Sequence, residues 1–355
     1  MHNLTMSRWL SPLMAFCLSF LIIASLAPMI GIDTERQLDF WGLWLVTMIV
    51  LALPLVYLEI ALAKRSKTTA LAALGQLTRD AESSTHWRLV GWLAVAFMPF
   101  LAGNMLFGAT KQLSIAGLSQ PIVLAIAIVV ALALSVLPRL ILILISSIAV
   151  IAALIASQMG AVAEPWQMTP VEFSEWGGAT LMALVATGLG LGAYWQTSVD
   201  SVAEQKQATP AVLPIWLAQI VAVIAFGFFA LNSQTTVITL LIASVFGSAV
   251  LLQLARQQLA QRQITVILQW IIVLVAVAVW LIPSVQSVLS AVLAVWGLVI
   301  CLIYAIFAGW IMKISHLRKS LNFSNEAIYN IWRIAVRIVL PLAIILALIS
   351  LVGTR

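Results

Sequence analysis

The residues of this chain that could carry chemistry are polar or glycine residues inside long apolar segments. The most distinctive group is Thr187-Gly188-Leu189-Gly190-Leu191-Gly192, with three glycines at alternate positions in the segment Trp176–Ser198. Each glycine weakens a helix by about 1 kcal/mol relative to alanine. Freed backbone groups in a membrane survive only where they line a cavity or are paired within the protein. The pattern therefore predicts either a broken helix that binds a solute or close packing through small residues.

Two further polar residues lie within apolar segments. Glu59 is a functional candidate by default, because an ionisable group inside a membrane span is costly. Its alternative is an interfacial carboxylate, since Lys64 and Arg65 follow about a turn later. Asn104 could line a pathway or form a hydrogen bond between helices.

Enzyme chemistry has no support in the sequence. The three histidines, His2, His86 and His316, are far apart, and no phosphate-cradling loop, catalytic triad or metal-ligand spacing occurs. Cys17 and Cys301 both fall in apolar segments, where neither a disulfide nor a metal site is expected. The net charge of +6 comes from loops rather than from a basic run, so nucleic acid is not an expected partner. We expect no enzyme activity and no cofactor.

The elements that must position these residues are transmembrane helices. Hydrophobic residues make up 63% of the chain and charged residues 8%, against ~45–50% and ~25% in soluble domains. A spanning helix needs ~20 apolar residues, so about eleven helices leave only short loops. We predict an all-α polytopic membrane protein with one transmembrane domain over 1–355. The expected segments are Leu10–Ile30, Phe40–Ala63, Leu89–Gly108, Pro121–Leu137, Leu140–Ser157, Trp176–Ser198, Ala211–Leu231, Val237–Leu254, Ile264–Ile282, Val288–Met312 and Ala327–Leu351.

Charge placement predicts the orientation. With the N-terminus inside, all but three of the 18 Lys and Arg residues fall on the cytoplasmic side. The exceptions are Arg36, Lys111 and Arg355. This predicts a multi-pass protein of the cell inner (plasma) membrane with a cytoplasmic N-terminus. A signal peptide cleaved near Ala24–Ala27 is the alternative, and it would leave about ten helices. Tryptophans near predicted borders, Trp280 and Trp332 among them, are expected in the interfacial belts.

Several segments carry motifs of a known family. Leu53-Pro54-Leu55-Val56-Tyr57-Leu58-Glu59 followed by Ala63-Lys64 is similar to Pro-Leu-x-x-x-Glu-x-x-x-Gly-Arg, and Gly188–Gly192 is similar to Ser-Leu-Gly-x-Gly. Further matches in spacing are Gly91, Pro99, Trp332, Arg337 and Pro341. The chain thus resembles the neurotransmitter–sodium symporter family, its bacterial amino-acid transporters in particular. The resemblance runs thinly from about Phe40 to the C-terminus.

The resemblance implies an inverted-repeat (5+5) symporter-like fold plus one extra helix. The first repeat would cover 10–158, the second 171–313, and the extra helix 325–352. A solute site would lie between the first, third, sixth and eighth helices, and Glu59 would accept hydrogen bonds from amides of Gly188–Gly192. Glu59 and Pro28 would have structural or coupling roles. The residues expected to bind solute are Ser25, Asn104, Met105, Thr187, Gly188, Gly190, Gly192, Phe246 and Ser248.

The residues with which the family binds sodium are missing. Where the family's first helix has Gly-Asn-x-x-Arg-Phe-Pro, this chain has Ile22-Ile23-Ala24-Ser25-Leu26-Ala27-Pro28, so the helix has no glycine to unwind at. Whether that helix is broken or continuous stays open. In the eighth helix the family's ligands fall near Phe246 and Gly247, leaving only Ser248. Apolar side chains offer no oxygen to an ion, so we expect no intact sodium site.

Two functions remain open from the sequence. One is secondary active transport of a small amino-acid-like or apolar amine solute, with a proton as the alternative coupling ion and Glu59 as its carrier. The other is a non-transporting, symporter-like scaffold or subunit of a membrane complex. The expected partners are the lipid bilayer and the solute, with a membrane protein partner or a homodimer as further candidates.

Overall fold

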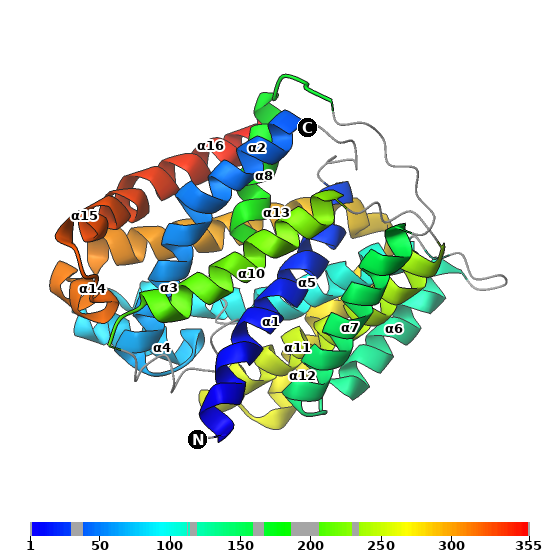
Figure 1. Ribbon diagram of the computed structural model, residues 1–355. Coiled ribbons are helices and arrows are strands. Elements are labelled where there is room, and N and C mark those ends of the chain that lie inside the picture. The colour runs from blue at the N-terminus through cyan, green and yellow to red at the C-terminus, as the bar shows by residue number, and fades with distance from the viewer. Residues whose placement is uncertain are drawn as a thin grey trace.

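The chain folds into a bundle of long helices (Figure 1). This computed structural model describes residues 2–29, 38–111, 113, 119–158, 167–185, 206–228 and 234–353. The α-helices are α1 (His2–Leu26), α2 (Leu38–Thr47), α3 (Leu53–Ser66), α4 (Ala70–Asp80), α5 (Leu89–Lys111), α6 (Gln120–Leu134), α7 (Arg139–Gln158), α8 (Phe173–Val185), α10 (Thr209–Phe228), α11 (Gln234–Gln261), α12 (Val266–Ala278), α13 (Gln286–Ile306), α14 (Ile314–Leu321), α15 (Glu326–Ile334) and α16 (Leu340–Gly353).

Most of these helices have the length and composition of membrane spans. Among the described residues, eight helices are long and apolar enough to cross a membrane, and two shorter apolar helices accompany them. α6 ends at Leu134 and α7 begins at Arg139, so the apolar run across Pro138 forms two helices, as predicted. The all-α polytopic fold is confirmed, whereas the count of about eleven spans stays a prediction.

The first helix is continuous. α1 runs from His2 to Leu26 without a break and accommodates Pro12. A single 3₁₀ turn, η1 (Ala27–Met29), follows it, and the exposed Pro28 lies in this turn. Proline disfavours the α conformation of the residue before it, which explains why the α-helix ends there. The sequence Ile22–Ala27 contains no glycine that would weaken the helix earlier.

A tryptophan compensates for a proline in the last span. The π-helical segment η8 (Ala335–Val339) joins α15 to α16 just before Pro341. A proline cannot donate to the carbonyl four residues earlier, which here belongs to Arg337. The indole Nε1 of Trp310 donates to that carbonyl at 3.1 Å. A neighbouring helical segment therefore supplies the hydrogen bond that the proline removes.

Two tryptophans predicted for the membrane interface are buried instead. Trp280, in the turn η5 (Val279–Leu281), is fully buried, and its Nε1 donates to the Phe100 carbonyl at 3.0 Å. Trp332 of α15 is 5% exposed, and its Nε1 donates to the Pro54 carbonyl at 3.0 Å. The expectation that these two indoles face lipid headgroups was wrong, because an indole N–H can pair with a backbone carbonyl inside a bundle as well as with headgroups.

The centre of the bundle is built from α1, α5, α7 and α11. α11 packs along both α7 and α5, and α1 packs along α10 and α5. In Figure 1 the N-terminus lies at the bottom and the C-terminus at the top, while α4 and α14 gather near the end of α3. Large apolar side chains on α6, α7, α12 and α16 are exposed, as lipid-facing residues are.

Candidate functional site

A buried polar contact joins α1 to α5 at the predicted solute site. Asn104 of α5 is fully buried, and its Nδ2 donates to the Ser25 Oγ at 3.1 Å. Ser25 in turn donates to the Ile22 carbonyl one turn earlier at 2.9 Å. Within the described residues, the Asn104 Oδ1 has no hydrogen-bond partner. Burial of an amide oxygen without a hydrogen-bond partner costs folding free energy. The contact between α1 and α5 therefore leaves one acceptor available for a ligand.

α11 approaches the same level of the bundle through Gly247. A Cβ placed on Gly247 would lie 2.5 Å from Leu21 Cδ1 of α1 and 3.3 Å from Met105 Cε of α5. The missing side chain therefore allows three helices to meet closely. The next residue, Ser248, is fully buried, and its Oγ donates to the Ala102 carbonyl of α5 at 3.1 Å.

A second polar contact, which the sequence did not predict, ties α1 to α7 and α11. The Cys17 Sγ donates to the Ser146 Oγ at 3.0 Å, and Ser146 donates to the Ala243 carbonyl at 2.8 Å. Both side chains are buried. The only feature of the sequence that could have indicated this contact is a serine, Ser146, inside an apolar segment. Its partner Cys17 is 129 residues away in the sequence. Cys17, for which the sequence predicted neither a disulfide nor a metal site, is therefore a hydrogen-bond donor between helices.

The structure brings together four of the predicted solute-binding residues. The place where α1, α5 and α11 pack together contains Ser25, Asn104, Met105 and Ser248. Phe246, two positions before Ser248, is half-buried against the core. Pro28 lies exposed at the end of α1, outside this contact. The remaining predicted residues, Thr187, Gly188, Gly190 and Gly192, lie outside the described residues.

Glu59 is buried rather than interfacial. It is 3% exposed and lines a small cavity between α3, α4 and α13. Tyr304 lines the same cavity from α13, and its hydroxyl has no hydrogen-bond partner within the described residues. The α4 wall is apolar, with Ala70 and Leu74 among its residues. The predicted partners of Glu59, the amides of Gly188–Gly192, fall outside the described residues.

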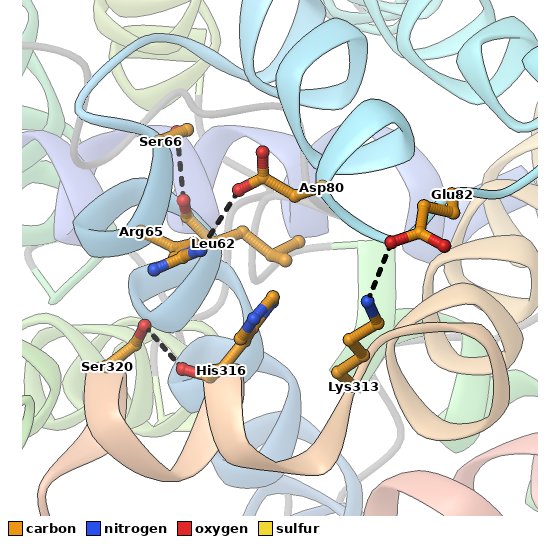
Figure 2. A network of polar contacts seen from close by, with 8 residues as sticks. All are labelled: Leu62, Arg65, Ser66, Asp80, Glu82, Lys313, His316 and Ser320. Carbon is orange, nitrogen blue, oxygen red and sulfur yellow. Dashed lines mark hydrogen bonds and ion pairs between the residues drawn. The ribbon is translucent and has the colours of Figure 1, made fainter.

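A network of charged side chains closes the end of the bundle where α3, α4 and α14 meet (Figure 2). Arg65 at the end of α3 pairs with Asp80 of α4 at 3.1 Å, and Lys313 pairs with Glu82 at 3.0 Å. His316 of α14 points toward the Arg65–Asp80 pair (Figure 2). All four paired side chains are at least a third exposed, so each pair adds about 1 kcal/mol or less. The network orients α14 more than it stabilises the fold.

Acid should weaken this end of the bundle through His316. Burial, and after it the charge of Arg65, holds the pKa of His316 below its ordinary value of 6.5, while Asp80 opposes the shift. The unfolded chain therefore binds a proton first, and the stability that neutral His316 contributes is lost as pH falls below about 6.5. We expect the melting temperature between pH 7.5 and 5.5 to fall more in the wild type than in His316→Asn. His86→Asn, an exposed histidine outside the network, is the control. Parallel curves for wild type and His316→Asn would contradict this expectation.

A solved structure has the same arrangement of helices. The crystal structure of MhsT in complex with L-phenylalanine aligns with a TM-score of 0.66 and covers 96% of this chain and 98% of that chain. The fold is shared with MhsT. The identity between the two chains is 16%, so the likeness extends to the fold alone. No protein-family model matches the sequence, and no curated protein matches it.

The likeness to MhsT confirms the predicted symporter-like, all-helical membrane fold. It covers nearly the whole chain. The single transmembrane domain and its division into two repeats stay predictions. Membership of the neurotransmitter–sodium symporter family also stays a prediction. The sequence left open whether the first helix is broken or continuous, and α1 is one helix up to Leu26.

Proposed function

We propose that this protein is a secondary transporter of a small amino-acid-like solute, bound where α1, α5 and α11 meet. The observation that carries the proposal is the unpaired Asn104 Oδ1, a fully buried acceptor beside Ser25. The ammonium group of an amino acid or amine offers N–H donors and no acceptor, so it is a suitable partner for such an oxygen. The fold supports this choice, because the MhsT structure with the same fold contains L-phenylalanine.

Transport without sodium is part of the proposal. The side chains nearest to Gly247 are those of Leu21, Met105 and Ser146, and of these only Ser146 carries an oxygen. Ser25 and Ser248 donate their hydroxyl hydrogens to backbone carbonyls. Sodium would have to be held by more oxygens than these three hydroxyls provide. We propose a proton as the coupling ion and the buried Glu59 as its carrier, in an inner membrane with the N-terminus inside.

Uptake by liposomes tests both parts of the proposal. The purified protein is reconstituted and offered a panel of amino acids and amines, with L-phenylalanine first, under a sodium gradient, a proton gradient or neither. We expect uptake that a proton gradient drives and that sodium does not change. Glu59→Gln should abolish the effect of the proton gradient. Uptake that requires sodium would overturn the coupling proposal and leave the transport proposal standing.

A non-transporting scaffold is the second candidate, and the packing gives it specific support. α1 is continuous, and bulky side chains fill the space at both Gly103 and Gly247. A static bundle that holds a partner protein or a second copy would permit both features. Absence of uptake and of thermal stabilisation by every solute in the panel, with a membrane protein co-purifying, would favour this function over transport.

A further inference from the structure

A small cavity between four helical segments has two arginines in its lining. It lies between η7 (Phe307–Ile311), α14, α15 and η8, with Leu317 and Trp332 in its apolar wall. Arg333 and Arg337, one helical turn apart, complete the lining. Gly309 permits this arrangement, because a Cβ there would lie only 3.0 Å from the Arg337 Cγ. The cavity therefore combines an apolar wall with two guanidinium groups.

Neither arginine has an acidic partner in the part of the chain that the structure describes. Within the described residues the three ion pairs use Arg65, Lys313 and Arg318, and none involves Arg333 or Arg337. Both side chains are half-buried. Arg337 lies over the exposed ring of Trp310, 4.6 Å from its centroid, which holds the guanidinium in place without neutralising it. Two partly desolvated cations that no acidic group of the described residues neutralises would be stabilised by a counter-ion from outside the protein.

The depth of the cavity indicates where that counter-ion comes from. Ile331, Ile334 and Ile338 on the same helical segments are 68%, 52% and 49% exposed, as side chains that face lipid are. Trp310, at 59% exposed, is typical of an anchor at the headgroup level. Long cationic side chains near helix ends reach toward this level. The guanidinium groups therefore lie where the phosphates of one leaflet lie.

We propose that Arg333 and Arg337 form a binding site for the headgroup phosphate of an anionic phospholipid, whose apolar part rests against the wall of the cavity. Guanidinium groups bind phosphate through paired, charge-assisted hydrogen bonds, which suits a site with two of them. A soluble phosphate is a poorer fit, because it has no apolar part to pack against the apolar wall of the cavity. The site lies apart from the α1–α5–α11 contact, so it does not depend on the proposed transport function.

Native mass spectrometry of the full chain in detergent tests the site. The protein is titrated with a phosphatidylglycerol, a phosphatidylcholine of the same acyl chains, and glycerol 3-phosphate. We expect phosphatidylglycerol to bind most tightly, and the variant Arg333→Gln/Arg337→Gln to bind it about 30-fold more weakly, or about fivefold for each arginine. Arg79→Gln removes an exposed cation on α4, far from the cavity in sequence, and should bind as the wild type does.

A second variant distinguishes the effect of the charges from that of guanidinium geometry. It also provides a test of the proposal if the glutamine variant fails to fold. Arg333→Lys/Arg337→Lys keeps both charges, so we expect affinity between those of the wild type and the glutamine variant. Equal retention of phosphatidylglycerol by wild type and glutamine variant would overturn the proposal. Competition by glycerol 3-phosphate as strong as that by phosphatidylglycerol would also overturn it, since the site would then take a soluble phosphate.

Discussion

Trp280→Ala should lower the free energy of unfolding by about 2–3 kcal/mol, one of the two largest effects that we expect from a single substitution in this protein. The indole is fully buried against the rings of Phe100 and Phe107, with centroids 5.2 and 5.5 Å away. It also donates to the Phe100 carbonyl. In lipid the transfer of apolar surface contributes little, so the loss comes from the cavity and the missing contacts.

Gly103→Ala should destabilise the fold through the same contact. The added Cβ would lie 2.3 Å from Trp280 Cδ1, so the indole or α5 must shift, at a cost of about 1–3 kcal/mol. In the Trp280→Ala background this clash is absent, and the new methyl group partly fills the cavity. The double variant should therefore be more stable than the sum of the two single effects predicts. Gly42→Ala is the control, because nothing lies within 4 Å of its added Cβ.

Unfolding can be followed in detergent with a thiol-reactive dye, since both cysteines, Cys17 and Cys301, are buried in the folded protein. The dye reports their exposure as temperature or denaturant rises. Additive effects of Gly103→Ala and Trp280→Ala would show that the two side chains do not compete for one space.

The fold was predictable because it depends on local sequence features. Apolar length gave the spans, and Pro138 with Arg139 marked the end of one and the start of the next. The absence of a glycine in Ile22–Ala27 left the state of the first helix open, and the structure shows it continuous up to Leu26. Asn104 was expected to line a pathway or to bond another helix, and it does bond another helix.

What the sequence could not predict is how distant residues pair. The role of Gly103 depends on Trp280, because the missing side chain of Gly103 leaves the space that the indole of Trp280 fills. The turn η5 places Trp280 against α5, and no local sequence pattern predicts this contact. Cys17 and Ser146 form their hydrogen bond across a comparable separation. Hydropathy correctly predicts that each of these side chains lies in an apolar segment, but it does not predict which distant residue each side chain contacts.

Asn104→Leu should weaken binding of an amine-bearing solute by about 10- to 100-fold, which corresponds to the loss of one hydrogen bond to a charged group, about 1.5–3 kcal/mol. Leucine has the same branched skeleton as asparagine, with two methyl groups in place of the amide oxygen and nitrogen, and Ser25 keeps its hydrogen bond to the Ile22 carbonyl. The fold should therefore survive the change. Thr110→Val is the matched control. It removes a buried polar group from the same helix, and the Thr110 hydroxyl donates only within α5, to the Leu106 and Phe107 carbonyls.

Asn104→Asp distinguishes an acceptor from a packing role. The carboxylate keeps oxygen at the position of Oδ1, and Ser25 can donate to it instead of receiving a bond. If the solute's ammonium group binds this oxygen, the aspartate variant should retain the binding that the leucine variant loses. Equilibrium binding of radiolabelled L-phenylalanine, or of whichever solute the uptake panel identifies, measures all three variants. Equal affinity in the leucine variant and the wild type would exclude Asn104 from the site. Equal loss in the leucine and aspartate variants would mean that the bond between Asn104 and Ser25 matters for shape, and that the unpaired oxygen is not what holds the solute.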